Sequence, residues 1–398
     1  MERPPWRRAN AWSRGNPKHT KFYIKTIRMK LEKNKKKKIW MVAMALAAFV
    51  IPKGARAQQT ASAIVSTAVP FMLIAPDARS SAMGDEGTGN PDEIDAIYYN
   101  PAGLAFQTGR AVALTHSQWL PQFNQNDLFY DNLNFMWNDE NRFGGTIAAN
   151  ITFLNLGTFI YTTEASPNPI TTFHSFEYAV TAAYATKLSS DWGFGGSLRY
   201  IESVLSTLHV ANEQSNGVGE SVSFDLSALW KPDSTYIDGI ANDLEVGFLL
   251  SDVGPKIKYV DALQADPLPT ELRVGVSYKL YSDQYNDLTI ASDLGKLMVH
   301  QLAGQPADPL PKSLITSWDD STMHSFMWST GVEYWYDQLL ALRAGYYAEG
   351  SHVGGRHYLT FGAGLRYDVY QFDFSYIDAL VQDSPLANTL RFTLGIRF

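Results

Sequence analysis

Side chains that could carry chemistry are sparse in this chain of 398 residues. It has no cysteine, which excludes disulfides, cysteine metal sites and a lipid-modified N-terminal cysteine. The eight histidines show neither an HExxH pattern nor a paired ligand spacing, and there is no GxSxG nucleophile motif. We therefore expect no enzymatic activity, no cofactor and no metal site.

The most distinctive spacing of polar residues lies in one stretch, residues 69–106, which is dense in turn formers and charges. An Asn-Pro pair at 90–91 followed by two acidic residues is typical of a helix start. A second Asn-Pro pair at 100–101 disfavours continuation of that helix. The sequence thus predicts a short helix over 91–99. The stretch is either a lead-in that caps the core or a plug inside a barrel.

The N-terminus differs from the rest in charge. Residues 1–57 hold 16 of the 33 Lys and Arg residues but only 2 of the 40 Asp and Glu residues, so the remainder carries a formal charge of −21. A basic run at 30–38, an apolar run at 39–51 and Ala55-Arg56-Ala57 are typical of a signal peptide. We expect residues 1–57 to be a signal peptide whose true start is Met29; the alternative is a single membrane anchor. The acidic remainder argues against nucleic-acid binding.

From residue 109 to the end, apolar and polar residues alternate. In the last segment one face carries Leu390, Phe392, Leu394, Ile396 and Phe398. Segments of about ten residues or more suit tilted strands that cross a membrane, whereas sandwich strands are shorter. Aromatic residues collect at the segment ends, as in outer-membrane barrels, and the terminal phenylalanine resembles their assembly signal. We therefore predict an all-β fold, a transmembrane antiparallel β-barrel over 109–398 with the N-terminal segment 58–108 as its plug.

The alternation places about 14 strands, an even number, as expected for such barrels. They lie near 109–119, 127–137, 142–163, 174–187, 191–204, 218–231, 241–254, 270–281, 286–297, 323–336, 339–349, 357–369, 371–382 and 387–398. Counted back from a periplasmic C-terminus, the long connections, 164–173 among them, fall outside and the short ones inside, with 232–240 longer than expected. The third segment requires a bend near residues 155–157.

A resemblance to a known family accompanies this pattern. Residues 71–85, FMLIAPDARSSAMGD, and residues 98–105, YYNPAGLA, resemble the N-terminal motif of the PorV/PorQ family of type IX secretion outer-membrane proteins. The Asn-Pro-Ala element is also similar to that of FadL-type transporters of hydrophobic compounds. We take the motif to hold the plug in register through Pro76, Asp77, Arg79, Met83, Gly84, Asp85, Asn100, Pro101 and Ala102.

The resemblance implies a location in the bacterial outer membrane, in contact with its lipid, and a non-enzymatic role in protein secretion. Proteins of this family bind the C-terminal domains of secreted cargo at a large translocon barrel protein and pass them to a surface attachment complex. The competing hypotheses are a FadL-like transporter of small hydrophobic molecules and an outer-membrane lipid-modifying enzyme. Mutation of a buried lumen serine or histidine would address the last.

Partner binding is expected on the long outer loops, 205–217, 255–269 and 298–322. Apolar side chains on loops otherwise exposed to water often mark partner sites. The candidates are Leu263, Leu268, Leu302, Leu310 and Leu314. The alternative is that these side chains cover the barrel mouth and pack on one another.

Overall fold

The computed structural model describes residues 65–123, 127–163, 166–208, 216–233, 235–237, 240–259, 265–302, 305–319, 323–380 and 384–398. The predicted signal peptide, residues 1–57 with Met29, lies outside this part of the chain and stays a prediction. No helix in the described ranges is both long enough and apolar enough to span a membrane.

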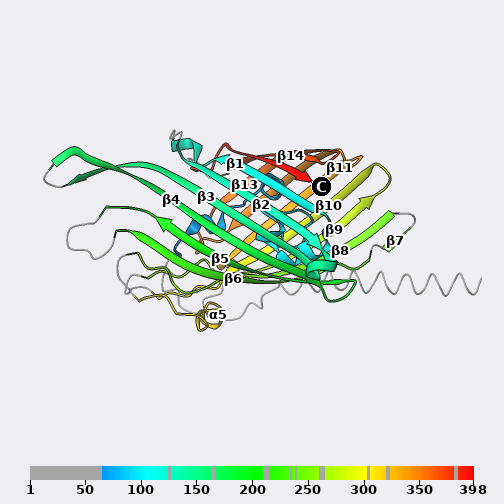
Figure 1. The fold of residues 1–398 in the computed structure, drawn as a ribbon, viewed down its shortest axis with the longest axis horizontal. Coiled ribbons are helices and arrows are strands. Elements are labelled where there is room, and N and C mark those ends of the chain that lie inside the picture. Colours follow the sequence, from blue (N-terminus) through cyan, green and yellow to red (C-terminus); the bar gives the residue numbers. More distant parts are fainter. Residues whose placement is uncertain are drawn as a thin grey trace, which may run out of the picture. The chain divides into compact units, whose positions relative to one another are not determined.

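The described chain forms a closed antiparallel barrel of fourteen strands (Figure 1). Each strand pairs with its neighbours in sequence, β1 pairs with β15, and the pairing of β6 with β8 closes the sheet. The strands are β1 (Arg110–Gln118), β2 (Phe129–Asp139), β3 (Gly145–Thr163), β4 (Ser166–Lys187), β5 (Trp192–Val204), β6 (Val218–Trp230), β8 (Ile240–Val253), β9 (Glu271–Ser282), β10 (Asn286–Leu297), β11 (Phe326–Tyr336), β12 (Leu340–Glu349), β13 (His357–Tyr367), β14 (Tyr370–Ala379) and β15 (Thr389–Arg397). The predicted fold class and the even strand number are confirmed.

Two details of the strand prediction have different outcomes. The bend in β3 is confirmed, because its register against β4 shifts between Asn155 and Gly157. The predicted outer loop 164–173 is wrong: β4 already begins at Ser166, where it pairs with Thr163 of β3. The long connection after β6 contains a short extra strand, β7 (Thr235–Ile237), which pairs with the start of β8.

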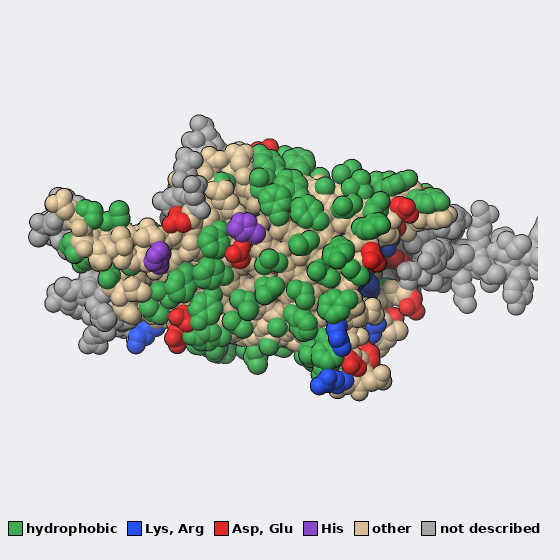
Figure 2. All heavy atoms as spheres, turned by 45° about the horizontal axis from the view of Figure 1, so that its top comes forward, with side chains coloured by type: hydrophobic (Ala, Val, Ile, Leu, Met, Phe, Trp, Pro, Cys, Tyr) green, Lys and Arg blue, Asp and Glu red, His purple; other side chains and the backbone are tan. Residues whose placement is uncertain are grey.

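Burial in the barrel wall is inverted relative to a water-soluble protein. Along β15, Thr389, Arg391 and Thr393 are buried, whereas Leu390 and Phe392 are 39% and 40% exposed. Figure 2 shows apolar side chains spread over the outside of the wall. Exposed aromatic residues lie where several short turns join the strands, as in an interfacial girdle: Trp192, Tyr281, Tyr285, Tyr336, Tyr367 and Tyr370. The outer face is therefore built to contact lipid.

The two ends of the barrel differ. At one, the short-turn end, the strands are joined through 140–144, 188–191, 231–239, 283–285, 337–339 and 368–369, and the barrel's own termini also lie there. At the other, the long-loop end, the connections are 119–128, 205–217, 254–270, 298–325, 350–356 and 380–388, together with the β3–β4 hairpin. The short helical turns η3 (Pro121–Phe123), α5 (Ser313–Thr316) and η5 (Met323–Ser325) belong to the long-loop end, and α4 (Glu140–Phe143) to the short-turn end.

Residues 65–109, the plug, lie inside the barrel and carry η1 (Pro70–Leu73), α2 (Ala78–Ala82), α3 (Ala96–Tyr99) and η2 (Pro101–Phe106). The predicted helix over 91–99 is wrong at its start. Asp92 and Glu93 instead reach the barrel wall, where they pair with Lys231 and Arg366. These contacts override the local helix signal, and only residues 96–99 form a helical turn. The break at 100–101 is where the sequence places it.

Candidate functional site

The first plug helix, α2, is seated through its N-terminus. Asp77 caps it, because its carboxylate accepts a hydrogen bond from the Ser80 N–H at 2.8 Å. The Ala78 N–H donates to the Thr393 hydroxyl of β15 at 2.9 Å, which ties the helix start to the wall. Pro76, the residue before the cap, is also buried. Asp77 thus caps the helix, while the backbone of Ala78 attaches it to the barrel wall.

A buried charge network extends from the same helix. Arg79 donates from Nε and Nη2 to the two Glu333 carboxylate oxygens, both at 3.0 Å, and lies 3.5 Å from Glu93. Arg343 of β12 reaches Glu333 at 2.7 Å and Asp373 of β14 at 2.6 Å. All five side chains are less than 10% exposed. A bidentate pair of this kind neutralises the buried charge of Arg79 and also restricts the position of the plug.

A turn of the plug binds a wall carboxylate through its backbone. The N–H groups of Gly87, Thr88 and Gly89 donate to the Asp293 carboxylate of β10 at 2.9, 2.8 and 3.3 Å. Consecutive backbone N–H groups that converge on one anion form a strong site for negative charge. This side chain is an anchor for the plug that sequence reasoning missed.

The Met83-Gly84-Asp85 segment lies against β12 and β13. Met83 is fully buried, and the Gly84 N–H donates to the Thr360 hydroxyl at 2.9 Å. Asp85 accepts a hydrogen bond from the Tyr358 hydroxyl. Gly84 has φ +77°, and a Cβ there would collide with the backbone of Tyr346. Glycine is needed here for both its conformation and its size.

The second half of the motif closes the plug on itself. The Asn100 side chain donates to the Thr88 carbonyl at 2.9 Å and accepts from the Ala102 N–H at 3.2 Å. The same N–H also donates to the Ser227 hydroxyl of β6 at 2.9 Å. Pro101 between them is buried. The motif residues quoted from the sequence therefore all lie inside the barrel.

Glycines of the wall form the receiving surface for this plug. A Cβ added to any of seven inward-facing strand glycines would clash with plug atoms: Gly193, Gly195, Gly247, Gly275, Gly331, Gly345 and Gly362. Glycine inside a strand often marks a place where another backbone approaches closely. That signal was present in the sequence, and it would have indicated which strands face the plug.

One carboxyl of the plug has no partner. Glu86 is fully buried, and neither of its carboxylate oxygens makes a hydrogen bond within the described residues. Burial raises the pKa of Glu86 well above its ordinary value; the nearby Asp293 raises it further and Arg79 opposes the shift. Burial in the closed plug therefore shifts the equilibrium of Glu86 toward its neutral form.

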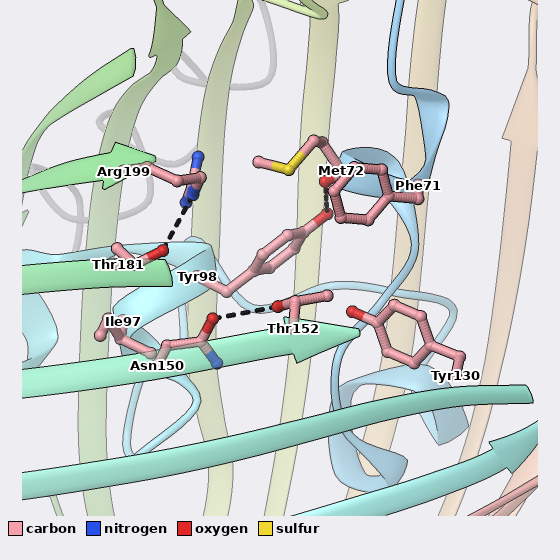
Figure 3. A pocket seen from close by; sticks show the side chains of 9 residues that line it. All are labelled: Phe71, Met72, Ile97, Tyr98, Tyr130, Asn150, Thr152, Thr181 and Arg199. Carbon is pink, nitrogen blue, oxygen red and sulfur yellow. Dashed lines mark hydrogen bonds between the residues drawn. The ribbon is translucent and has the colours of Figure 1, made fainter. Parts of the chain in front are cut away.

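Two cavities lie between plug and wall within the described residues. One has an empty volume of about 290 Å³ and the other, beside Glu93, about 350 Å³, both with open solvent included. The first is lined mainly by residues of the plug and of β3 to β5. Figure 3 shows Tyr98 crossing it, with its hydroxyl on the Met72 carbonyl at 2.9 Å. Its lining residues are Phe71, Met72, Ile97, Tyr98, Tyr130, Asn150, Thr152, Thr181 and Arg199.

The leucines proposed for partner binding are in different environments. Leu302 is 50% exposed, Leu310 and Leu314 are partly buried, and Leu268 is fully buried. Leu263 lies outside the described residues. Further apolar side chains on the same 298–325 connection are also exposed: Ile315 at 75%, Trp318 at 45% and Met323 at 70%.

An acidic residue organises that connection. Asp308 accepts hydrogen bonds from Lys312 at 2.7 Å and from the Thr316 hydroxyl at 2.8 Å, and it lies 2.9 Å from His300. The Lys312 and Thr316 hydrogen bonds lower the pKa of Asp308 to about 2. Within the described residues, no group of three or more His, Asp or Glu side chains is arranged to hold a metal ion.

Comparisons with known proteins bear on this arrangement. Residues 56–303 match the family model described as "Type IX secretion system protein PorV". No curated protein sequence matches the chain. Among solved structures, the toluene transporter TbuX of Ralstonia pickettii is similar with a TM-score of 0.44 and 14% identity, over 82% of this chain and 100% of that one. The toluene transporter TodX of P. putida gives 0.46 and 12% over 81% and 98%, and a Pseudomonas aeruginosa FadL homologue gives 0.45 and 11% over 85% and 100%.

Proposed function

The chain belongs to the PorV family of type IX secretion system proteins, and from that premise we propose that it is a non-catalytic carrier of exported proteins. It binds the C-terminal signal domain of cargo at a large translocon barrel protein and passes it to a surface attachment complex. The protein resides in the bacterial outer membrane, as its closed barrel with an apolar outer face requires.

The observation that carries this proposal is the filled lumen. The plug contacts the wall on many strands through buried ion pairs, backbone hydrogen bonds and close glycine packing. A barrel closed in this way offers its loops to partners rather than its interior to solutes. The long-loop end is the elaborated end, and we assign it to the cell exterior because outer-membrane barrels have short periplasmic turns and longer external loops.

The exposed apolar side chains of the 298–325 connection supply a contact surface. Ile315 is 75% and Met323 70% exposed, and Trp318 on the same connection is 45% exposed. Grouped exposed apolar residues mark protein interaction sites. We propose that this connection contacts the cargo domain or the translocon.

A binding experiment with a matched control tests the proposal. The purified barrel in mild detergent is titrated with a recombinant C-terminal domain of one secreted cargo protein. Ile315→Asn at the long-loop end should weaken binding, whereas Leu188→Asn at the short-turn end, where the exposed fraction is a comparable 71%, should not. Absence of binding by the unmodified barrel, or equal loss in both variants, would refute the assignment.

The competing function is transport of small hydrophobic molecules. It requires the plug to move, because buried ion pairs and close glycine contacts hold the plug across the lumen. Uptake into liposomes that contain the barrel separates the two functions. Uptake that rises when the plug is loosened would support transport, and recovery of the translocon protein with the purified barrel supports the carrier.

A further inference from the structure

Two arginines and a tryptophan lie together on the barrel wall at the short-turn end. Arg110 of β1 and Trp137 of β2 are directly opposite each other on neighbouring strands. The guanidinium carbon of Arg110 lies 4.4 Å from the centre of the Trp137 ring, and that of Arg142 on α4 lies 5.1 Å from it. Both distances end at the same ring, so the two guanidinium groups cannot be further apart than the sum of the two. We call Arg110, Trp137 and Arg142 the rim site.

The rim site belongs to the lipid-facing side of the wall. Side chains alternate between the two faces of a strand, so Trp137 shares the outer face of β2 with Phe135 and Leu133, which are 37% and 42% exposed. Arg110 shares the outer face of β1 with Leu114, which is 51% exposed. Tryptophan and arginine at the end of an apolar surface are typical of the boundary between hydrocarbon and headgroups. The rim site therefore lies at the level of the lipid headgroups.

Neither guanidinium group has an acidic partner among the residues that the structure describes. No ion pair or hydrogen bond joins either one to a side chain there, Glu140 on the same turn included. The Asp139 carboxylate accepts a hydrogen bond from the backbone N–H of Arg142 at 3.0 Å, and the Phe398 oxygen accepts one from the backbone N–H of Arg110 at 2.8 Å. These two acceptors therefore bind the backbone and leave two permanent positive charges for an external anion.

The turn that carries Arg142 is fixed by its neighbours. The Tyr184 hydroxyl donates to the carbonyls of Phe143 and Gly144 at 3.0 and 3.2 Å. The Thr186 hydroxyl donates to the same Gly144 carbonyl at 2.7 Å. The Phe143 ring packs edge-on against Trp137, with ring centres 5.1 Å apart. These contacts place Arg142 beside the tryptophan before any ligand binds, which lowers the cost of ordering it on binding.

We propose that the rim site binds the phosphate of an anionic phospholipid in the leaflet at the short-turn end. Guanidinium groups fit phosphate oxygens through paired N–H···O hydrogen bonds. The acyl chains of the same lipid lie along the outer side chains of Phe135, Leu133 and Leu114. A headgroup with its own ammonium brings a like charge toward the arginines, so a lipid of the phosphatidylglycerol type binds better than a zwitterionic one. This lipid site does not depend on the proposed carrier function.

Lipid titration with a matched control tests the site. The purified barrel in uncharged detergent is titrated with phosphatidylglycerol or with phosphatidylcholine of the same acyl chains, and native mass spectrometry measures the lipid bound. Arg110→Gln and Arg142→Gln each remove a charged donor and should weaken phosphatidylglycerol binding roughly tenfold. Lys187→Gln removes a positive charge at the same end of the barrel, but Lys187 lies over the plug residue Phe106, so binding should stay within about twofold. Heat-modified migration on gels checks that each variant is folded.

Each outcome either supports or overturns the assignment. Selective weakening in the two arginine variants, together with weaker binding of phosphatidylcholine by the parent, supports it. Equal binding of the two lipids by the parent, or equal weakening in the arginine and lysine variants, would overturn it. Inorganic phosphate, added as a competitor, should not displace the lipid, because it lacks the acyl chains that contact the outer wall. Displacement by phosphate alone would indicate a site for the free anion and would overturn the assignment to a membrane lipid.

Discussion

Replacing Arg79 with methionine tests how the plug is held. The change keeps much of the side-chain length but removes two hydrogen bonds to Glu333 and the contact with Glu93. Removing one partner of a buried ion pair costs about 3–5 kcal/mol when the other charge is left uncompensated. Here Glu333 keeps Arg343 and Glu93 keeps Arg366, so we expect the lower end, about 3 kcal/mol.

That free energy should appear as a larger population in which the plug is out of place. A loss of about 3 kcal/mol corresponds to roughly a hundredfold change in the opening equilibrium. Because the chain has no cysteine, a single Ser80→Cys variant provides a clean reporter in α2, where the side chain is buried. Its rate of maleimide labelling in detergent should rise roughly a hundredfold when Arg79→Met is added, provided that closing is faster than labelling.

A second substitution separates the ion pair from simple loss of packing. Glu333→Gln should cost less in the Arg79→Met background than in the parent, because one of the two arginines that Glu333 binds is already absent. The four variants form a cycle whose coupling free energy belongs to the Arg79–Glu333 pair. A labelling rate within twofold of the parent in Arg79→Met would show that the buried ion pairs do not hold the plug.

Three further predictions use measurements of the same kind. Gly345→Ala places a Cβ against the backbone of the plug and should cost about 1–3 kcal/mol, so labelling at position 80 should accelerate, whereas Gly395→Ala, which meets only ordinary contacts beyond 3.5 Å, should not change it. Glu86→Gln should slow labelling at pH 8 and have less effect at pH 4. The pKa of Glu86 is raised in the folded state, so its contribution to the stability of the closed plug is present below the unfolded pKa and is lost as the pH rises. Glutamine cannot ionise and therefore removes this loss at high pH. Asp308→Asn should make the 298–325 connection more sensitive to proteolysis at pH 7, and the parent should become sensitive only as the pH falls toward 2, because a lowered pKa gives stability that is lost on acidification. An unchanged labelling rate in the glycine variant, a pH-independent effect in the Glu86 variant, or equal proteolysis of both proteins at pH 7 would contradict the respective argument.

The strands could be predicted from sequence because each residue of a barrel wall faces either lipid or lumen. This requirement repeats every second residue and leaves a local pattern, as in Leu390 and Phe392 beside Arg391 and Thr393. It placed the fourteen strands and the bend at Gly157. The start of β4 was missed because Pro167 and Pro169 indicate a loop, whereas an edge strand tolerates them.

The position of the plug in the chain could be predicted from sequence, but its contacts with the barrel wall could not. Its motif identified the segment, yet the partner of Arg79 lies 254 residues away in β11, and no local spacing connects the two. The same holds for Asp293. The three backbone N–H groups that bind it lie 204 to 206 residues before it in the chain. For residues 91–95 the helix signal was outweighed by contacts with the wall. Polar side chains in the lumen bind residues that are distant in sequence, and a single sequence does not indicate which two residues bind each other.

Two consecutive segments of the plug, residues 77–93 and 94–106, are held by different forces. Residues 77–93 meet β10 to β15 mainly through ion pairs and hydrogen bonds to Glu333, Asp293 and Thr360. Residues 94–106 pack apolar side chains, Ile97 and Leu104 among them, on small wall residues of β1 to β4. Separation of the first segment would break buried ion pairs, and hydration of the freed charges would offset part of that loss, whereas separation of the second would expose apolar surface to water.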